Sequence, residues 1–139
     1  MSLTCSTASR AATVSARAPA YVDLIEPGLV LPTDQAGADR GRSIVNQLGL
    51  DCGLDATDTA AQLLAREGHK VGVLGFSWGG TVALLANTRL GLPAVSYYAT
   101  RSPPVRDEPA GAPLMFHFGA LDAAIPPAII DLHRQKQPQ

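Results

Sequence analysis

The residues best suited to chemistry lie in one short run of the chain, Gly75-Phe-Ser77-Trp-Gly79. The run matches the pattern G-x-S-x-G, in which a serine on a sharp turn between a strand and a helix presents its hydroxyl as a nucleophile. Small residues on both sides of Ser77 allow such a turn, which holds the serine in a strained conformation. The alternative is a glycine-rich packing turn without chemistry, and the flanking elements decide between the two.

The segments on either side of the motif have the character that it requires. Residues 70–75 form a short apolar run bounded by glycine, as expected of a buried strand. Residues 78–89 carry Val82 and Ala86 at helical spacing. Strand, turn and helix therefore follow one another, and the sequence predicts that Ser77 is a nucleophile at the N-terminus of a helix.

Helical and extended patterns alternate along the rest of the chain. The expected elements are a helix at 56–66, strands at 93–98 and 113–118, an exposed loop at 101–112 and a final helix from Pro126 towards Lys136. Strands that alternate with helices imply parallel pairing and the α/β class. Residues 1–18 match no element and are expected to be disordered, whereas residues 19–139 are expected to form one domain.

Composition and charge exclude several classes of function. Of the 139 residues 46% are hydrophobic and 17% are charged, which is typical of one small globular domain. Lys plus Arg number 11 against 12 for Asp plus Glu, so no net field attracts nucleic acid or anionic lipid. The longest uncharged run, residues 71–88, contains four glycines and fits a packed turn better than a membrane span. Cys5 and Cys52 are too few for a disulfide scaffold and lack metal-site spacing, which suits a cytoplasmic location.

Several segments together resemble the dienelactone hydrolase family. They are residues 71–80 with the elbow, 93–98, His117-Phe-Gly-Ala-Leu-Asp122 with Ile125-Pro126 and, less distinctly, Val22-Asp-Leu24 and Pro27-Gly28. The resemblance implies an incomplete α/β-hydrolase fold, a three-layer sandwich around a mostly parallel sheet. It also implies hydrolysis of a small ester or lactone by a nucleophile, acid and histidine triad, with no metal or organic cofactor.

The resemblance further implies roles for individual residues. Ser77 takes the nucleophile position, where the family usually has cysteine, and Asp122 takes the position of the triad acid just after a strand. The backbone N–H of Trp78, the residue after the nucleophile, would donate a hydrogen bond to the oxyanion. Arg40 aligns loosely with an arginine that grips a substrate carboxylate, and a solvated surface arginine is the alternative.

A serine nucleophile needs a base, and the expected histidine is missing from its place. In the family it follows the acid by roughly thirty residues, whereas the 139-residue chain continues for only 17 residues beyond Asp122. His69 precedes the elbow strand and is expected at the wrong end of the sheet. His117, His133 and a histidine from a partner chain remain as alternatives.

The N-terminal part is also shorter than the family pattern, in which a central strand and its loop supply the second oxyanion donor. We therefore expect a gap beside the elbow strand, which residues 21–24 or 13–16 would fill, or an open edge that pairs with another copy of the chain. The predicted function is ester or lactone hydrolysis. The alternative is a catalytically inactive fragment or an interaction module that keeps the elbow as architecture only.

Overall fold

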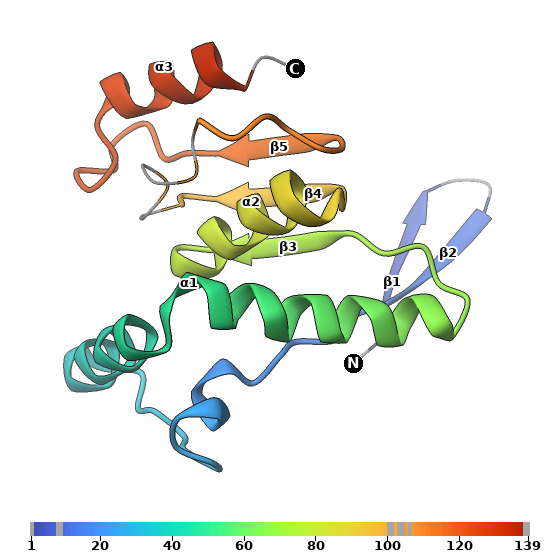
Figure 1. Ribbon diagram of the computed structural model, residues 1–139, viewed down its shortest axis with the longest axis horizontal. Coiled ribbons are helices and arrows are strands. Elements are labelled where there is room, and N and C mark those ends of the chain that lie inside the picture. Colours follow the sequence, from blue (N-terminus) through green and yellow to red (C-terminus); the bar gives the residue numbers. More distant parts are fainter. Residues whose placement is uncertain (1, 8–9, 100–101, 103–104, 106, 138–139) are drawn as a thin grey trace.

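A parallel three-stranded sheet forms the centre of the computed structural model (Figure 1). The structure describes residues 2–7, 10–99, 102, 105 and 107–137. The strands of this sheet, in spatial order, are Val73–Phe76 (β3), Ala94–Tyr97 (β4) and Leu114–His117 (β5). Both neighbouring pairs are parallel, with Phe76 opposite Tyr97 and Tyr97 opposite His117. The α/β class that the alternating pattern predicts is therefore confirmed.

The helices that accompany the sheet are Gln35–Arg66 (α1), Trp78–Leu90 (α2) and Pro127–Lys136 (α3). The predicted helix after the elbow and the predicted final helix are confirmed to within a residue or two at their ends. Residues 71–88, the long uncharged run, form β3, the elbow and most of α2. Among the described residues, no helix combines the length and the apolar character that crossing a membrane requires.

The second helix, α2, is buried on nearly every side because it packs between α1 and the sheet. Every residue from 80 to 87 is buried. Ser96 Oγ donates a hydrogen bond to the carbonyl of Gly80 at 2.8 Å and so joins the helix to β4. The helix ends at Gly91, whose left-handed φ of 67° turns the chain back towards the sheet. The other elements are thus arranged around α2.

The first helix, α1, begins about twenty residues earlier than the predicted helix at 56–66. Its N-terminus is capped by Asp34, whose carboxylate accepts a hydrogen bond from the backbone N–H of Gly37 at 2.8 Å. A kink interrupts the helix at Gly49, which has a φ of 77° and a ψ of 166°. Glycines lower the helix propensity of the first half, and the kink shifts its apolar stripe. Only the second half is therefore recognisable from periodicity.

The N-terminal segment contains an antiparallel ribbon in which Ser2–Thr7 (β1) pairs with Arg10–Ser15 (β2). The sequence pattern does not predict this ribbon, and the alternative in which residues 13–16 fill the gap beside β3 is wrong, because residues 13–15 belong to β2, which pairs with β1. The proposed filling of the sheet gap by residues 21–24 is wrong, because Tyr21–Leu24 form a short 3-10 helix (η1). Since β2 pairs with β1 and not with β3, the edge of β3 stays open. The boundary between residues 18 and 19 stays a prediction.

The loop between β4 and β5 is buried at two of its described positions, although its composition predicts an exposed loop. Ser102 and Val105 are each only 1% exposed. The positions 100–101, 103–104 and 106, which the prediction of an exposed loop also covers, lie outside the described residues. Ser102 and Val105 therefore contribute to the core, whereas residues 107 and 109–111 are exposed as predicted.

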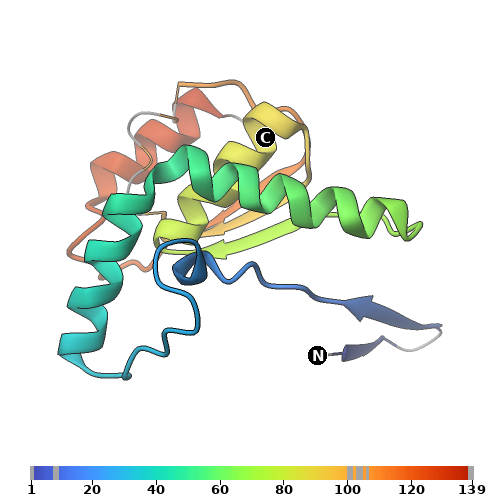
Figure 2. The same ribbon diagram turned by 60° about the horizontal axis from the view of Figure 1, so that its bottom comes forward.

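The helices cover only one face of the parallel sheet. In Figure 1, α2 lies in front of β3 and β4; Figure 2 shows the three helices on one side of the strands. The opposite face carries Leu74, Phe76 and Met115, which are 57%, 53% and 56% exposed. Within the described residues the predicted sandwich thus has two layers, and the fold is incomplete on this face and at the edge of β3.

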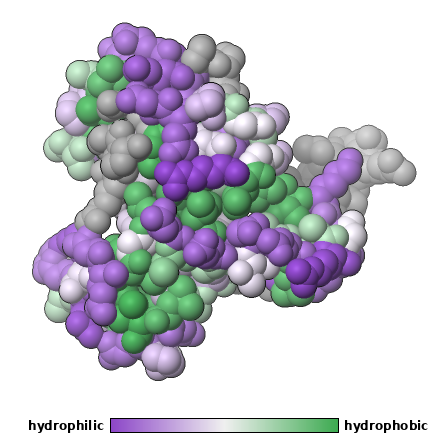
Figure 3. Space-filling model, viewed as in Figure 1, coloured by the Kyte–Doolittle hydropathy of each residue, from purple (hydrophilic) through white to green (hydrophobic). Residues whose placement is uncertain are grey.

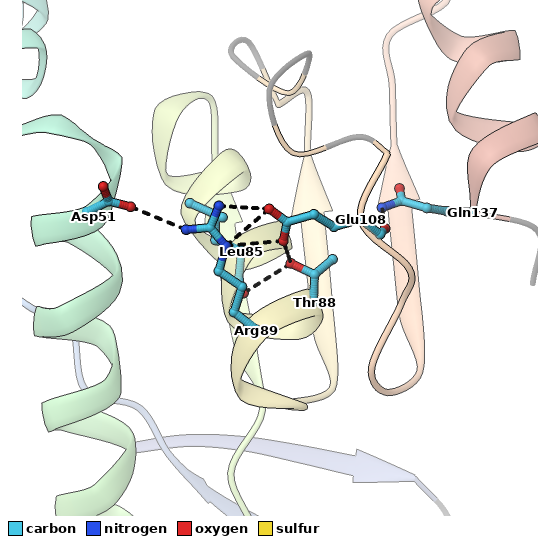
Figure 4. A network of polar contacts seen from close by, with 6 residues as sticks. All are labelled: Asp51, Leu85, Thr88, Arg89, Glu108 and Gln137. Atoms are coloured by element: carbon cyan, nitrogen blue, oxygen red, sulfur yellow. Dashed lines mark hydrogen bonds and ion pairs between the residues drawn. The ribbon is translucent and has the colours of Figure 1, made fainter.

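Polar contacts at the C-terminal end of α2 connect it to its neighbours (Figure 4). Glu108 accepts hydrogen bonds from Arg89 Nη2 and from Thr88 Oγ1, each at 2.7 Å. Arg89 also reaches Asp51 on α1 at 3.3 Å, and Gln137 Nε2 donates to the carbonyl of Glu108 at 3.2 Å. The hydrogen bond from Arg89 holds the pKa of Glu108 below its usual value. Arg89 thereby links α2 to α1, and the backbone carbonyl of Glu108 links this network to Gln137 at the end of α3.

A buried asparagine organises the inner side of the same region. Asn87 is 0% exposed, and its Nδ2 donates to the carbonyl of Leu92 at 2.9 Å and of Ala112 at 3.0 Å. Its Oδ1 accepts a hydrogen bond from the backbone N–H of Gly111 at 3.3 Å. One side chain thus holds together the segments that lead into β4 and β5.

We expect Asn87→Ala to lower the free energy of unfolding by about 3 kcal/mol, because it leaves buried carbonyl and N–H groups without partners. Urea unfolding followed by circular dichroism measures the change. Asn46→Ala is the matched control, since Asn46 is exposed on α1, and it should change stability by less than about 0.5 kcal/mol. Equal losses in the two variants would contradict the role given to Asn87.

Candidate active site

The turn between β3 and α2 has the geometry of a nucleophile elbow. Ser77 has a φ of 54° and a ψ of −120°, and Tyr98 is the other described non-glycine residue with a positive φ. A hydrogen bond from the backbone N–H of Ser77 to the carbonyl of Tyr97, at 3.0 Å, fixes the turn against β4. Such a conformation costs about 1–3 kcal/mol and persists only where the surroundings enforce it.

The glycines of the motif make this turn possible by close approach of backbone to backbone. A Cβ on Gly75 would lie 1.9 Å from the carbonyl oxygen of Gly79, and one on Gly80 would lie 2.7 Å from that of Tyr97. A Cβ on Gly79 would meet nothing within 4 Å. Two of the three glycines are therefore required by packing, and the third is not.

The Ser77 side chain is half-buried, and none of the described residues forms a hydrogen bond with its hydroxyl. It caps α2, whose first internal hydrogen bond runs from the N–H of Thr81 to the carbonyl of Ser77 at 3.3 Å. The N–H groups of Trp78, Gly79 and Gly80 therefore have no partner within the helix. Free N–H groups at the positive end of a helix dipole stabilise a negative oxygen placed beside them.

The indole of Trp78 is packed between η1 and α1. Its ring makes an edge-to-face contact with Tyr21 at 5.2 Å between centroids. On the other side, a Cβ on Gly53 would lie 2.6 Å from the indole, so α1 approaches Trp78 as closely as a glycine allows. Trp78 Nε1 is the one buried side-chain nitrogen or oxygen of the described residues without a hydrogen-bond partner. The residue after the serine is thus held firmly by its own side chain.

A cavity of about 400 Å³ runs along the open edge of β3 and reaches the elbow at Gly75 and Gly79. Its wall includes the Tyr21 and Thr57 side chains. Thr57 Oγ1 donates to a backbone carbonyl of α1 at 2.8 Å, so the hydroxyl of Tyr21, 2.7 Å away, is the donor to Thr57. Burial raises the pKa of Tyr21 above its usual value, which keeps this hydroxyl protonated. The cavity is of the size that holds a small ligand.

The proposed triad acid, Asp122, lies at the same end of the parallel strands as Ser77. Asp122 follows β5 in a tight turn, is half-buried, and accepts a hydrogen bond on Oδ1 from the N–H of Ala124 at 2.8 Å. Ser77 follows β3, and since β4 lies between β3 and β5 the ends of these two strands are separated by about 10 Å.

Each histidine has a different environment. His69 precedes β3 and therefore lies at the opposite end of this strand from Ser77. It pairs with Glu67 at 3.8 Å. His117 ends β5, is exposed, and stacks on Tyr97 at 4.4 Å between ring centroids. His133 on α3 is 2% exposed and contacts the Phe116 ring at 4.7 Å.

The sequence pattern does not predict the partners of His133. Ser102 Oγ lies 2.8 Å from its Nε2, and Gln137 Oε1 lies 3.4 Å from its Nδ1. The sequence gives one indication of these contacts: Gln137 follows His133 by four residues, and residues four apart lie on the same helix face. His133 therefore has a structural environment that joins α3 to the loop after β4.

Arg40 lies on the first half of α1, which Figures 1 and 2 place at the end of the molecule towards which the strands of the parallel sheet point. Its side chain is 55% exposed, and Nη2 pairs with Glu26 at 2.6 Å. The structure thus gives Arg40 a surface ion pair. Its role in binding substrate stays a prediction.

We expect the two glycines of the motif to differ when each is replaced by alanine. Gly75→Ala should cost at least about 3 kcal/mol of unfolding free energy, because its Cβ collides with backbone. Gly79→Ala should leave stability unchanged or raise it by up to about 1 kcal/mol, because alanine favours the helix. Chemical denaturation of both variants measures the difference, and similar values would refute the packing proposed for this turn.

Comparison with protein families gives one match. The model of the dienelactone hydrolase family matches residues 32–137, well over half of the chain. Comparisons with curated proteins and with solved structures give no significant match. The matched region contains the elbow, the whole parallel sheet, Asp122 and α3. The resemblance inferred from the sequence is therefore confirmed, and the chain belongs to the dienelactone hydrolase family, whose members are hydrolases with an α/β fold.

Proposed function

We propose that this chain cleaves a small ester or lactone, with Ser77 as the nucleophile. Membership of the family supports hydrolase chemistry in general. The observation that carries the role of Ser77 is its strained conformation at the N-terminus of α2, with a φ of 54° and a hydroxyl that no described residue engages. A purely structural turn has no need of a strained serine, whereas a nucleophile must project from the backbone.

The proposed reaction has two stages. Ser77 Oγ attacks the carbonyl carbon and gives its proton to a base, while the N–H of Trp78 stabilises the negative oxygen of the tetrahedral intermediate. The bond to the alcohol breaks, the alcohol takes the proton, and an acyl group remains on Ser77. Water then hydrolyses this acyl-enzyme. In this scheme Asp122 orients the basic histidine and stabilises its charged form.

The source of the base determines how fast this chemistry runs. A triad without its histidine retains only about 10³–10⁴-fold acceleration over water, and lack of the second oxyanion donor costs a further factor of about 10² to 10³. A histidine contributed by another copy of the chain would restore the site. In that case specific activity rises with protein concentration, whereas a site completed within one chain has constant specific activity.

Arg40 suggests a substrate that carries a negative charge besides its ester or lactone group. The guanidinium would exchange its partner Glu26 for a substrate carboxylate, a replacement of one exposed ion pair by another. Because Cys52 is a free, exposed thiol, we further propose a cytoplasmic location, where thiols remain reduced.

The alternative function is that of an interaction module without catalytic activity. The observation that favours it is the engagement of each histidine elsewhere: His69 with Glu67, His117 with Tyr97, and His133 with Ser102. The elbow would then serve only to connect β3 to α2.

Hydrolysis of p-nitrophenyl acetate, compared between the wild type and Ser77→Ala, distinguishes the two functions. We expect the variant to lose essentially all activity above background, because it lacks the attacking oxygen, while its unfolding transition stays unchanged or shifts upwards as strain is relieved. Ser43→Ala, at an exposed position on α1, is the matched control and should retain wild-type activity. Equal activity in wild type and Ser77→Ala would remove the enzymatic function.

The proposal extends to the oligomeric state, because the edge of β3 is open. The N–H groups of Val73 and Ser77 bond to carbonyls beside β4, so those of Leu74 and Phe76 point towards the free edge. Unpaired backbone groups of this kind attract the strand of another chain. We expect size-exclusion chromatography to give a mass above that of a monomer, and a stable monomer at every concentration would contradict this contact.

A further inference from the structure

The indole of Trp78 is held between two walls, one on η1 and one on α1. On the first side the ring of Tyr21 meets it edge-to-face, with 5.2 Å between ring centroids. On the other side lies the backbone of Gly53, where a Cβ would be 2.6 Å from the indole ring. Trp78 is only 8% exposed. The indole can therefore shift only if one of the two walls shifts.

A chain of two hydrogen bonds joins these walls to each other. The Tyr21 hydroxyl donates to Thr57 Oγ1 at 2.7 Å, and Thr57 Oγ1 donates to the carbonyl of Gly53 at 2.8 Å. Thr57 is 5% exposed, so water competes little for these bonds. The chain starts on the residue that touches one side of the indole and ends on the residue that touches the other. The position of Tyr21 relative to Gly53 is thus fixed through Thr57.

Apart from these two hydrogen bonds, an apolar cluster packs around the indole. Hydrophobic side chains gather around η1 and the first half of α1 in the lower part of Figure 3. Leu48 and Val82 are buried together with Trp78. Apolar contacts impose no particular orientation, whereas a hydrogen bond requires a defined distance and angle. The hydrogen bonds through Thr57 therefore determine the placement of the Tyr21 ring more closely than the apolar packing does.

The indole is the side chain that anchors the start of α2. Gly79 and Gly80, the next two residues, have no side chain, and Phe76 before the serine is 53% exposed. The backbone nitrogen and the Cβ of Trp78 are bonded to the same Cα, so a shift or tilt of the ring is transmitted to the N–H group. The orientation of this N–H therefore depends on the two walls that hold the indole.

We infer that Tyr21 is a positioning residue, which acts through Thr57 and the indole to hold the backbone N–H of Trp78 where the oxyanion forms. This role rests on the proposed function, in which that N–H stabilises the tetrahedral intermediate. Displacement of a catalytic group by about 1 Å can cost about 10²-fold in rate. Loss of the Tyr21 hydroxyl loosens the walls but leaves the ring in place, so we expect a smaller loss, about tenfold in kcat. KM should change little, because an interaction made only in the transition state contributes to kcat and not to ground-state binding.

The test is the hydrolysis of p-nitrophenyl acetate by the full chain and by variants of the two hydroxyl groups. Tyr21→Phe keeps the ring, and Thr57→Val keeps the shape of the side chain; each lacks only the hydroxyl. Each should lower kcat about tenfold, with KM within about twofold of the wild-type value. Thr57→Ser keeps the hydroxyl but lacks the methyl group, and it should lose less activity than Thr57→Val. The double variant Tyr21→Phe/Thr57→Val should be little worse than Thr57→Val, because both changes break the same chain of hydrogen bonds.

The matched control is Thr59→Val, at an exposed position on α1. Thr59 Oγ1 also donates to the carbonyl four residues earlier, at 2.9 Å, but the carbonyl is that of Asp55 and not of a residue that touches the indole. This variant should keep the wild-type kcat. Circular dichroism verifies that every variant is folded.

Three results would each overturn the inference while leaving the proposed function intact. The first is an unchanged kcat in Tyr21→Phe. The second is a rise in KM alone, which would show that the hydroxyl contacts the substrate. The third is a larger loss in Thr57→Ser than in Thr57→Val, which would show that the methyl group packs and the hydroxyl does not position. A wild type no faster than Ser77→Ala would instead contradict the proposed function and this role together.

Discussion

The close approach of α2 to the strands beneath it is the constraint on which the rest of the structure depends. At Gly75 and Gly80 the backbone of the elbow lies against backbone carbonyls with no room for a Cβ. This contact places Ser77 in its strained conformation and seats α2 deeply enough for residues 80–87 to be buried. Core packing and the candidate chemistry therefore share one origin, since the same two glycines serve both.

Much of this region follows from the sequence because its signals are local. A glycine-bounded apolar run, the G-x-S-x-G pattern and a following helical period lie within twenty residues and agree with one another. The kinked first half of α1 is not recognisable from the sequence because its glycines obscure the helical period. Residues 21–24 form η1 and do not fill the sheet gap, because a short apolar segment has no periodicity that distinguishes a strand from a turn. Contacts that depend on tertiary packing, such as those of Asn87 with the segments leading into β4 and β5 or of Ser102 with His133, have no local signature.

The candidate site is likewise divided between local and distant determinants. Ser77 is positioned by the elbow, and Trp78 is held in addition by the packing of its indole against η1 and α1. Asp122 lies at the same end of the sheet as Ser77 only because β5 is parallel to β3, and this depends on the topology of the whole sheet. The identity of the base depends on contacts between residues that are far apart in the sequence. Neither His117 nor His133 is directed to Ser77 by spacing along the chain, and each is engaged by neighbours from other elements.

The position of the indole next to Ser77 has a practical consequence for spectroscopy. Trp78 is the single tryptophan of the chain, so its fluorescence arises from one site, directly beside the proposed nucleophile. The ring is 8% exposed and touches Tyr21 and the backbone of α1, so its emission is expected to be blue-shifted and sensitive to any displacement of the turn. Excitation of this chain at the red edge of the indole band therefore observes the elbow in isolation, without any introduced label.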